Sequence, residues 1–116
     1  MNEFDISELS VFFNSQYSLK FTIQVKMYEI SEGYQEMYLA NSNNTKLGGR
    51  GYKEYCYGGG GLDDDEDWTP EFSLLVPGTN CTNIMHMIYG AAGEGSDDWK
   101  LCGFKVKVTV VKGSVL

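Results

Sequence analysis

Two stretches of this chain alternate strictly between apolar and polar residues, and this alternation constrains the fold more than any other feature. In residues 104–110, phenylalanine and valine at the even positions alternate with lysine and threonine at the odd positions. Residues 19–27 repeat the pattern, with lysine, threonine and glutamine between the apolar side chains. A period of two places neighbouring side chains on opposite faces of the backbone, which indicates half-buried β-strands and not helices.

Both alternating stretches carry lysine on their polar face. If the two strands pair with each other, Lys20, Lys26, Lys105 and Lys107 form a basic patch on an otherwise acidic chain. Two interpretations stay open at this point. The patch is a binding surface, or it is a solvated strand face whose lysines protect the sheet against aggregation, and the second interpretation is the simpler one.

Turn signals recur at strand-like spacing through the rest of the chain. Fourteen glycines and 14% aromatic residues suit an all-β protein with many turns. At 116 residues the chain has the size of one domain, residues 1–116, in which residues 1–17 form an N-terminal arm or a short helix. We therefore predict an all-β fold, a single antiparallel β-sandwich or jelly roll of about seven or eight strands.

Further strands are predicted at residues 34–40, 52–57, 71–76 and 84–89, and a glycine-rich turn at residues 48–51. The strand at 84–89 is apolar on both faces and is therefore expected in the centre of a sheet, with His86 as a hydrogen-bonded core residue. The predicted core consists of Phe21, Ile23, Val25, Phe72, Leu74, Ile84, Ile88, Phe104, Val106 and Val108.

The chain is acidic, with a formal net charge of -7 and a pI near 4.5. This charge argues against nucleic acid as a partner, because nucleic-acid binders need basic surface to displace phosphate counterions. A cation, a basic protein partner or plain solubility stay open as explanations of the charge.

Three cysteines, Cys56, Cys81 and Cys102, are too few for a disulfide scaffold, and because their number is odd at least one is free or paired between chains. The N-terminus shows no signal-peptide pattern, and no apolar run approaches the length of a membrane span. We predict a soluble protein, with the cytoplasm favoured over secretion.

Two acidic stretches each lead into a tryptophan. Residues 63–67 precede Trp68, and a group that includes Asp97 and Asp98 precedes Trp99. If a sandwich brings both stretches to one end, their carboxylates can hold Ca²⁺, although the spacing is not that of an EF-hand, and two solvated loops are the alternative. The candidate metal ligands are Asp63, Asp65, Asp67, Asp97 and Asp98, and the candidate surface-binding residues are Trp68, Trp99, Tyr55 and Tyr57.

Catalytic chemistry is not apparent in the sequence. His86 is the only histidine, and no local signature pairs it with any of the three cysteines as nucleophile and base. The carboxylates lie in runs that suit solvation and show no sign of a raised pKa. We therefore expect a protein that is not an enzyme.

The second half of the chain resembles the lipoxygenase-homology (PLAT) β-sandwich. The resemblance rests on residues 72–76, 84–89, 95–99 and 104–110, and it is specific only over residues 72–110. It implies a non-catalytic module that binds a lipid surface or a partner protein, in some members through calcium held in loops at one end. It also implies that Trp99 anchors the final turn beside Asp97 and Asp98. The Thr-Gly turn usual at the start of the family is missing, and residues 58–67 have no clear counterpart.

The leading functional hypothesis is a non-enzymatic binding module for a protein or membrane surface, assisted by calcium. One alternative is a structural or self-assembling subunit, such as a coat, fibre or toxin-like component, that uses its strand edges and tyrosines. Another is an acidic inhibitor that occupies the basic groove of a partner.

Overall fold

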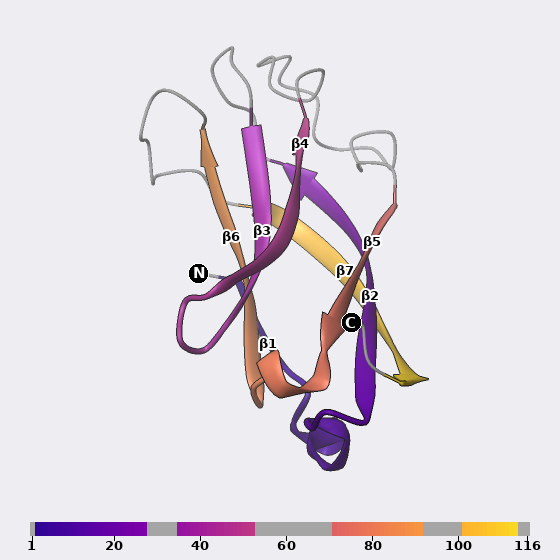
Figure 1. The fold of residues 1–116 in the computed structure, drawn as a ribbon. Coiled ribbons are helices and arrows are strands. Elements are labelled where there is room, and N and C mark those ends of the chain that lie inside the picture. Colours follow the sequence, from indigo (N-terminus) through magenta and orange to yellow (C-terminus); the bar gives the residue numbers. More distant parts are fainter. Residues whose placement is uncertain (1, 28–34, 53–70, 92–100, 114–116) are drawn as a thin grey trace.

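The computed structural model describes residues 2–27, 35–52, 71–91 and 101–113, and these residues form two antiparallel sheets (Figure 1). One sheet has the strand order β1-β6-β3-β4, and the other has the order β5-β2-β7. The strands are β1 (Asn2–Asp5), β2 (Tyr17–Met27), β3 (Gln35–Asn41), β4 (Lys46–Tyr52), β5 (Phe72–Pro77), β6 (Ile84–Ala91) and β7 (Leu101–Lys112). The arrangement confirms the predicted all-β, antiparallel sandwich.

The two alternating stretches become β2 and β7, which pair directly. Phe21 lies opposite Val108 and Ile23 opposite Val106, so the apolar positions of both strands share one face of the three-stranded sheet. That face points toward the other sheet, where Leu39, Met85 and Met87 are fully or almost fully buried. Burial of these apolar rows against each other is the main force that holds the two sheets together.

The predicted core is confirmed at Phe21, Ile23, Val25 and Phe72, which are all buried. The prediction overestimated burial at five positions that are only half-buried, namely Leu74, Ile84, Phe104, Val106 and Val108. Three of these five lie on β7, an edge strand that has a neighbour on one side only in the described residues. The side chain of Ile88 lies outside the described part of the chain.

Strand β6 lies between β1 and β3, which confirms its predicted central position. Its two faces are both apolar in sequence, and the structure turns Met85 and Met87 inward. His86 therefore lies on the outer face, where it is buried and hydrogen-bonded but is not part of the hydrophobic core.

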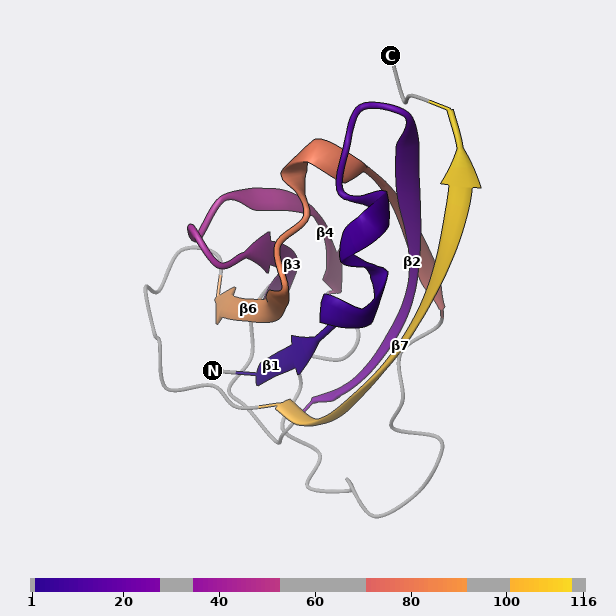
Figure 2. The ribbon, with the colours of Figure 1, turned by 90° about the horizontal axis from the view of Figure 1, so that it is seen from below.

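The N-terminus is part of the sandwich and does not form an arm. Residues Asn2–Asp5 pair with β6 as strand β1. In this strand, Glu3 and Asp5 face outward and Phe4 packs inward against Phe21. The predicted short helix is a 3-10 helix, η1 (Ser7–Phe12), which lies across one end of the sandwich (Figure 2). Among the described residues, no helix has the length and apolar character that a membrane crossing requires.

The glycine-rich segment predicted as a turn at residues 48–51 is instead part of strand β4. Gly48 has a φ of +154°, and a Cβ at this position would lie 2.9 Å from Leu74 Cδ2 on the facing sheet. Glycine in the strand thus permits the close approach of β4 to β5, which is a recognised use of glycine within sheets. The predicted strand at 52–57 lies outside the described residues beyond Tyr52.

Candidate binding surface

All of the site residues predicted from the sequence lie outside the part of the chain that the structure describes. They are Asp63, Asp65, Asp67, Asp97, Asp98, Trp68, Trp99, Tyr55 and Tyr57. Within the described residues, no three side chains of His, Cys, Asp or Glu come together in a group that could hold a metal ion. The calcium site stays a prediction from the sequence.

The strand ends that precede the two acidic stretches are described, and they lie on either side of the same residue. Strand β4 ends at Tyr52 and strand β6 ends at Ala91, and both of these residues pair with Gln35 of β3. The chain therefore enters both acidic stretches from neighbouring positions at the same end of one sheet. This is the arrangement of strand ends that a joint calcium site would require.

The described residues do bring together the predicted lysine patch. Strands β2 and β7 pair in a register that sets Lys20 opposite Thr109 and Lys107 opposite Thr22. Lys20 and Lys107 are thus diagonal neighbours, and diagonal Cβ atoms in an antiparallel sheet lie about 7–8 Å apart. Lys26 has the same backbone orientation opposite Gly103, although its side chain is not described.

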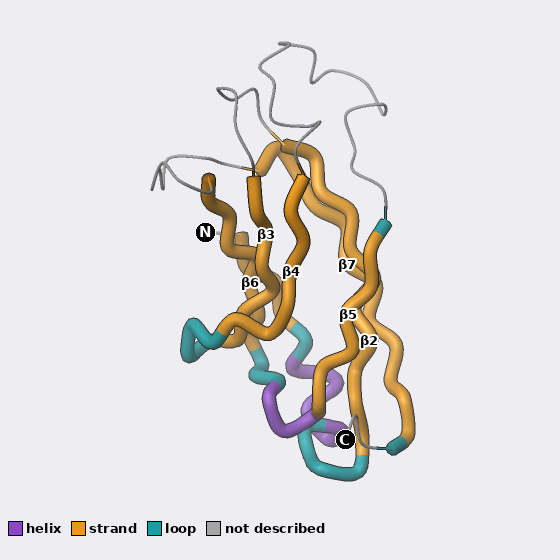
Figure 3. Tube along the Cα trace, turned by 45° about the horizontal axis from the view of Figure 1, so that its top comes forward, coloured by secondary structure: helices purple, strands orange, loops and turns teal. Residues whose placement is uncertain are grey.

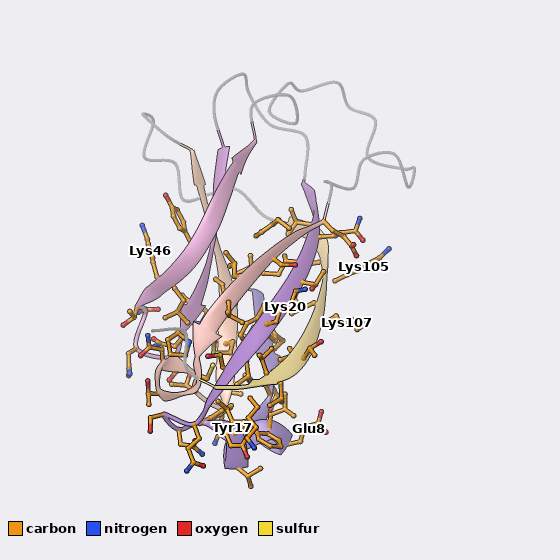
Figure 4. The ribbon with its side chains drawn as sticks, turned by 45° about the vertical axis from the view of Figure 1, so that its right-hand side comes forward. Glu8, Tyr17, Lys20, Lys46, Lys105 and Lys107 are labelled. Atoms are coloured by element: carbon orange, nitrogen blue, oxygen red, sulfur yellow. The ribbon has the colours of Figure 1, made fainter. Side chains whose placement is uncertain are left out.

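We use the term lysine face for the outer face of the three-stranded sheet. Figure 4 shows Lys20, Lys105 and Lys107 on this side of the molecule and Lys46 on the side of β4. All three lysines of the face are exposed. The members of the lysine face include Lys20, Thr22, Gln24, Ser73, Leu75, Lys105, Lys107, Thr109 and Val111.

A side-chain contact joins two strands across the lysine face. Thr22 Oγ1 and Ser73 Oγ lie 3.2 Å apart and join β2 to β5 through their side chains. Because the three ammonium groups share one face of a chain with net charge -7, they form a local positive field within an acidic protein. Such a field attracts carboxylates and other anions.

Exposed apolar side chains flank these lysines. The described residues contain three large hydrophobic side chains that are exposed, Val11 at 71%, Leu75 at 47% and Val111 at 37%. Leu75 lies directly opposite Lys20, and Val111 lies opposite Ser18 at the next outward position of β2. Two of the three exposed hydrophobic side chains therefore belong to the lysine face, where a partner could bury them.

The opposite sheet uses its outer polar groups differently. His86 is only 3% exposed, and its Nε2 lies 3.1 Å from Asn44 Oδ1 in the loop between β3 and β4. The ammonium group of Lys46 lies 4.4 Å from the centre of the Tyr38 ring, within the range of a cation–π contact. In the described part of this sheet, these polar groups therefore bind one another.

Short helices and turns close the end of the sandwich near η1, and Figure 3 shows them in purple and teal. We call it the closed end, and it comprises η1, residues 41–45 and residues 77–83, which include the 3-10 helix η3 (Gly78–Asn80). The Oδ1 atom of Asn41 accepts hydrogen bonds from the backbone N–H groups of Asn43 and Thr45 at 3.0 and 3.1 Å. Its Nδ2 donates to Asn80 O at 3.0 Å, which ties the two turns together.

Two ionisable groups, one in the closed end and one directly before η1, have shifted pKa values. Burial raises the pKa of the Cys81 thiol from 9.0 to about 11, and this buried cysteine is free. Hydrogen bonds from the Ser7 hydroxyl and the Ser7 backbone N–H lower the pKa of the Asp5 carboxyl from its usual 3.8. A thiol that stays protonated at neutral pH is a poor nucleophile, so Cys81 serves the packing of this end.

Sequence reasoning identified the lysines of the face and missed its β5 members. Residues 73–75 read Ser-Leu-Leu, so the sequence contains no alternation that would assign Leu75 to the outer face. Only the pairing of Leu75 with Lys20 and of Ser73 with Thr22 places them there.

Comparison of the chain with protein-family models, with curated proteins and with solved structures gives no match.

Proposed function

We propose that this protein is a non-enzymatic binding module whose lysine face engages an acidic surface of a partner protein. The observation that carries this proposal is the composition of the lysine face. Three exposed lysines and two exposed hydrophobic side chains share one outer sheet face of a chain with net charge -7.

The chemistry of the lysine face supports a protein as the partner. Lysine lies opposite threonine in two cross-strand pairs of β2 and β7, Lys20–Thr109 and Thr22–Lys107, at about 5 Å, the spacing of neighbouring strands. Such donors suit carboxylates presented by another polypeptide. Leu75 and Val111 add apolar area at two margins of the face, and interfaces combine such apolar contacts with polar ones. The resemblance of residues 72–110 to PLAT domains supports the same class of function, since members of that family commonly bind partner proteins or lipid surfaces.

The test is a binding measurement with fluorescent poly-L-glutamate at low and high salt, followed by anisotropy. We expect the wild-type protein to bind at low salt and to weaken as salt rises, because screening acts on exposed charges. The double variant K20E/K107E should lose this binding. A matched variant, K46E/K112E, changes the net charge equally with lysines outside the lysine face and should bind as the wild type does.

Two results would overturn the proposal. One is equal loss of binding in both double variants, which would make net charge the cause and leave the lysine face without a role. The other is binding to vesicles of phosphatidylserine and phosphatidylcholine without binding to poly-L-glutamate, which would make the surface a membrane contact.

We also propose that calcium orders the acidic stretches at the end where β4 and β6 finish. The support is the sequence of residues 63–67 and 94–98 together with the shared pairing of Tyr52 and Ala91 with Gln35. A ligand that binds only the folded state raises the melting temperature by linkage. Millimolar calcium should therefore raise the melting temperature and a chelator should reverse the rise, whereas an unchanged melting temperature would leave these acids as solubilising charge.

A further inference from the structure

The outer edge of β7 is open within the described residues. Strand β7 pairs with β2 alone and lies at the margin of its sheet. The pairing is continuous from Gly103 to Lys112 and shows no shift of register over that length. No proline interrupts the strand. A long regular edge of this kind offers a row of backbone donors and acceptors to another strand.

The hydrogen-bond pattern identifies which groups point to that edge. The N–H of Gly113 donates to Gln16 O at 2.8 Å, and these two residues follow directly on the pair Tyr17–Lys112. In an antiparallel ladder, pairs whose backbone groups bond to each other alternate with pairs whose N–H and C=O groups point to the outer sides of the two strands. The odd residues from 105 to 111 therefore bond to β2. Val106, Val108 and Val110 direct their N–H and C=O groups toward the open edge.

The side chains along this edge differ on the two faces of the sheet. Lys105 and Lys107 stand exposed on the lysine face. Val106 and Val108 lie on the core side, packed against the core but only half-buried. The facing strand β1 has only 4 residues, and its Phe4 ring lies 5.8 Å from the Phe104 ring, so it covers only part of this row. A strand added beside β7 would meet cations on one face and half-buried valine on the other.

We propose that the open edge of β7 accepts an extended segment of the partner protein, with acidic side chains alternating with apolar ones, as an added strand of the three-stranded sheet. The inference rests on the proposed function of the lysine face and specifies the partner. Acidic side chains of the added strand would lie beside Lys105 and Lys107, and its apolar side chains would cover Val106 and Val108.

A second copy of β7 fits this edge less well. Pairing of two β7 strands would place Lys105 and Lys107 of both copies on one continuous sheet face, where like charges repel. Lysines on an edge strand are a common protection against self-pairing. The same charges that repel a copy of this chain attract an acidic strand, so both effects select the same occupant.

The experiment uses the full chain and a fluorescent peptide of alternating glutamate and valine. A peptide of alternating lysine and valine is the charge control. A third peptide has the glutamate–valine sequence with N-methyl groups on alternate backbone nitrogens, which remove the donors that strand pairing requires. We expect the first peptide to bind, and the other two to bind at least about tenfold more weakly, the effect of one or two lost hydrogen bonds or of reversed charge.

Two variants test the edge itself. The variant V108P removes an N–H that points to the open edge and not to β2, a position where proline is tolerated in sheets. The variant V108A also removes the branched valine side chain but keeps the N–H. Binding should fall at least about tenfold in V108P relative to V108A. Thermal melting shows whether V108P folds, and the N-methylated peptide tests the inference on the wild-type protein if it does not.

The outcomes separate this inference from the proposed function. If the N-methylated peptide binds as well as its parent, strand addition is wrong while the lysine face keeps its role. If the glutamate–valine peptide and poly-L-glutamate both fail to bind, both proposals fall. If light scattering shows a dimer that V108P abolishes, a second copy occupies the edge and the inference is overturned.

Discussion

The closed end and the lysine face contrast in what their polar groups bond to. At the closed end, the side chain of Asn41 makes three hydrogen bonds, one of which ties the two turns together. The Thr82 hydroxyl accepts a hydrogen bond from the Ser42 N–H and donates one to Ile84 O. On the lysine face, the side chains of Thr22 and Ser73 bond to each other across neighbouring strands, and Lys20 and Lys107 are exposed. Groups with internal partners stabilise the fold, whereas exposed groups are available to other molecules.

This contrast separates the residues that we expect to affect the stability of the sandwich from those that we expect to affect binding. Changes at the closed end should reduce the free energy of unfolding because they leave buried polar groups unpaired or create steric clashes. Changes on the lysine face should leave that free energy almost unchanged and should act on binding. The following predictions test the contrast.

The largest effect is expected for Gly78→Ala at the closed end. A Cβ at this position would clash with Phe12 O and would lie 2.6 Å from Asn14 O, and these are backbone atoms that cannot rotate away. We expect the free energy of unfolding in urea to fall by about 3 kcal/mol or more, the upper part of the range for overpacking. The neighbouring exposed residue is the control, and Thr79→Ala should change stability by no more than about 0.5 kcal/mol. A Gly78→Ala protein as stable as wild type would refute the tight contact between η1 and η3.

The next largest effect is expected for Asn41→Ala. Removal of this buried side chain leaves the N–H groups of Asn43 and Thr45 and the C=O of Asn80 without the partner they have in the wild type. We expect a loss of about 2 kcal/mol in urea unfolding, because three hydrogen bonds of a buried side chain are lost together. The exposed Asn43 contributes only its backbone to this network, so Asn43→Ala should have little effect. Equal losses in the two variants would contradict the role of Asn41.

A smaller, pH-dependent effect is expected for Asp5. Because the Ser7 hydrogen bonds lower the pKa of Asp5 in the folded state, its carboxylate stabilises the fold above the unfolded-state pKa, 3.8, and this stabilisation is lost as the pH falls through the lowered value. Asp5→Asn cannot titrate, so its unfolding free energy should depend less steeply on pH below about 4. Ser7→Ala should remove part of the same dependence, since it removes the hydroxyl donor. Parallel pH profiles for all three proteins would show that this contact has no energetic weight.

The smallest change in stability is expected for the variant K20E/K107E. Exposed charges on a sheet face contribute little to folding, so urea unfolding should differ from wild type by no more than about 0.5 kcal/mol. The variant K46E/K112E serves again as the control of equal net charge. A large loss of stability in K20E/K107E alone would show that these lysines serve the fold, and the contrast between the two regions would disappear.

The sequence determined the parts of this fold in which each side chain has an unambiguous face. Residues 19–27 and 104–110 alternate so regularly that only one face of each can be buried, and side chains in a strand point to opposite faces in turn. The pairing of β2 with β7 therefore produced the lysine face at the residues predicted, Lys20, Lys105 and Lys107. The alternation alone shows which side chains share a face, because it depends only on neighbouring residues of one strand.

The tertiary structure decided everything that depends on neighbours distant in the sequence. Strand β6 is apolar on both faces, so its pattern cannot show that Met85 turns inward while His86 turns out to meet Asn44. Gly48 predicts a turn by composition, and only the approach of Leu74 from the facing sheet explains its place in β4. The position of β7 at an edge, which leaves Val106 and Val108 half-buried, likewise follows from strand order and not from the strand's own residues. Burial and pairing are properties of two surfaces in contact, and a local sequence pattern describes only one of them.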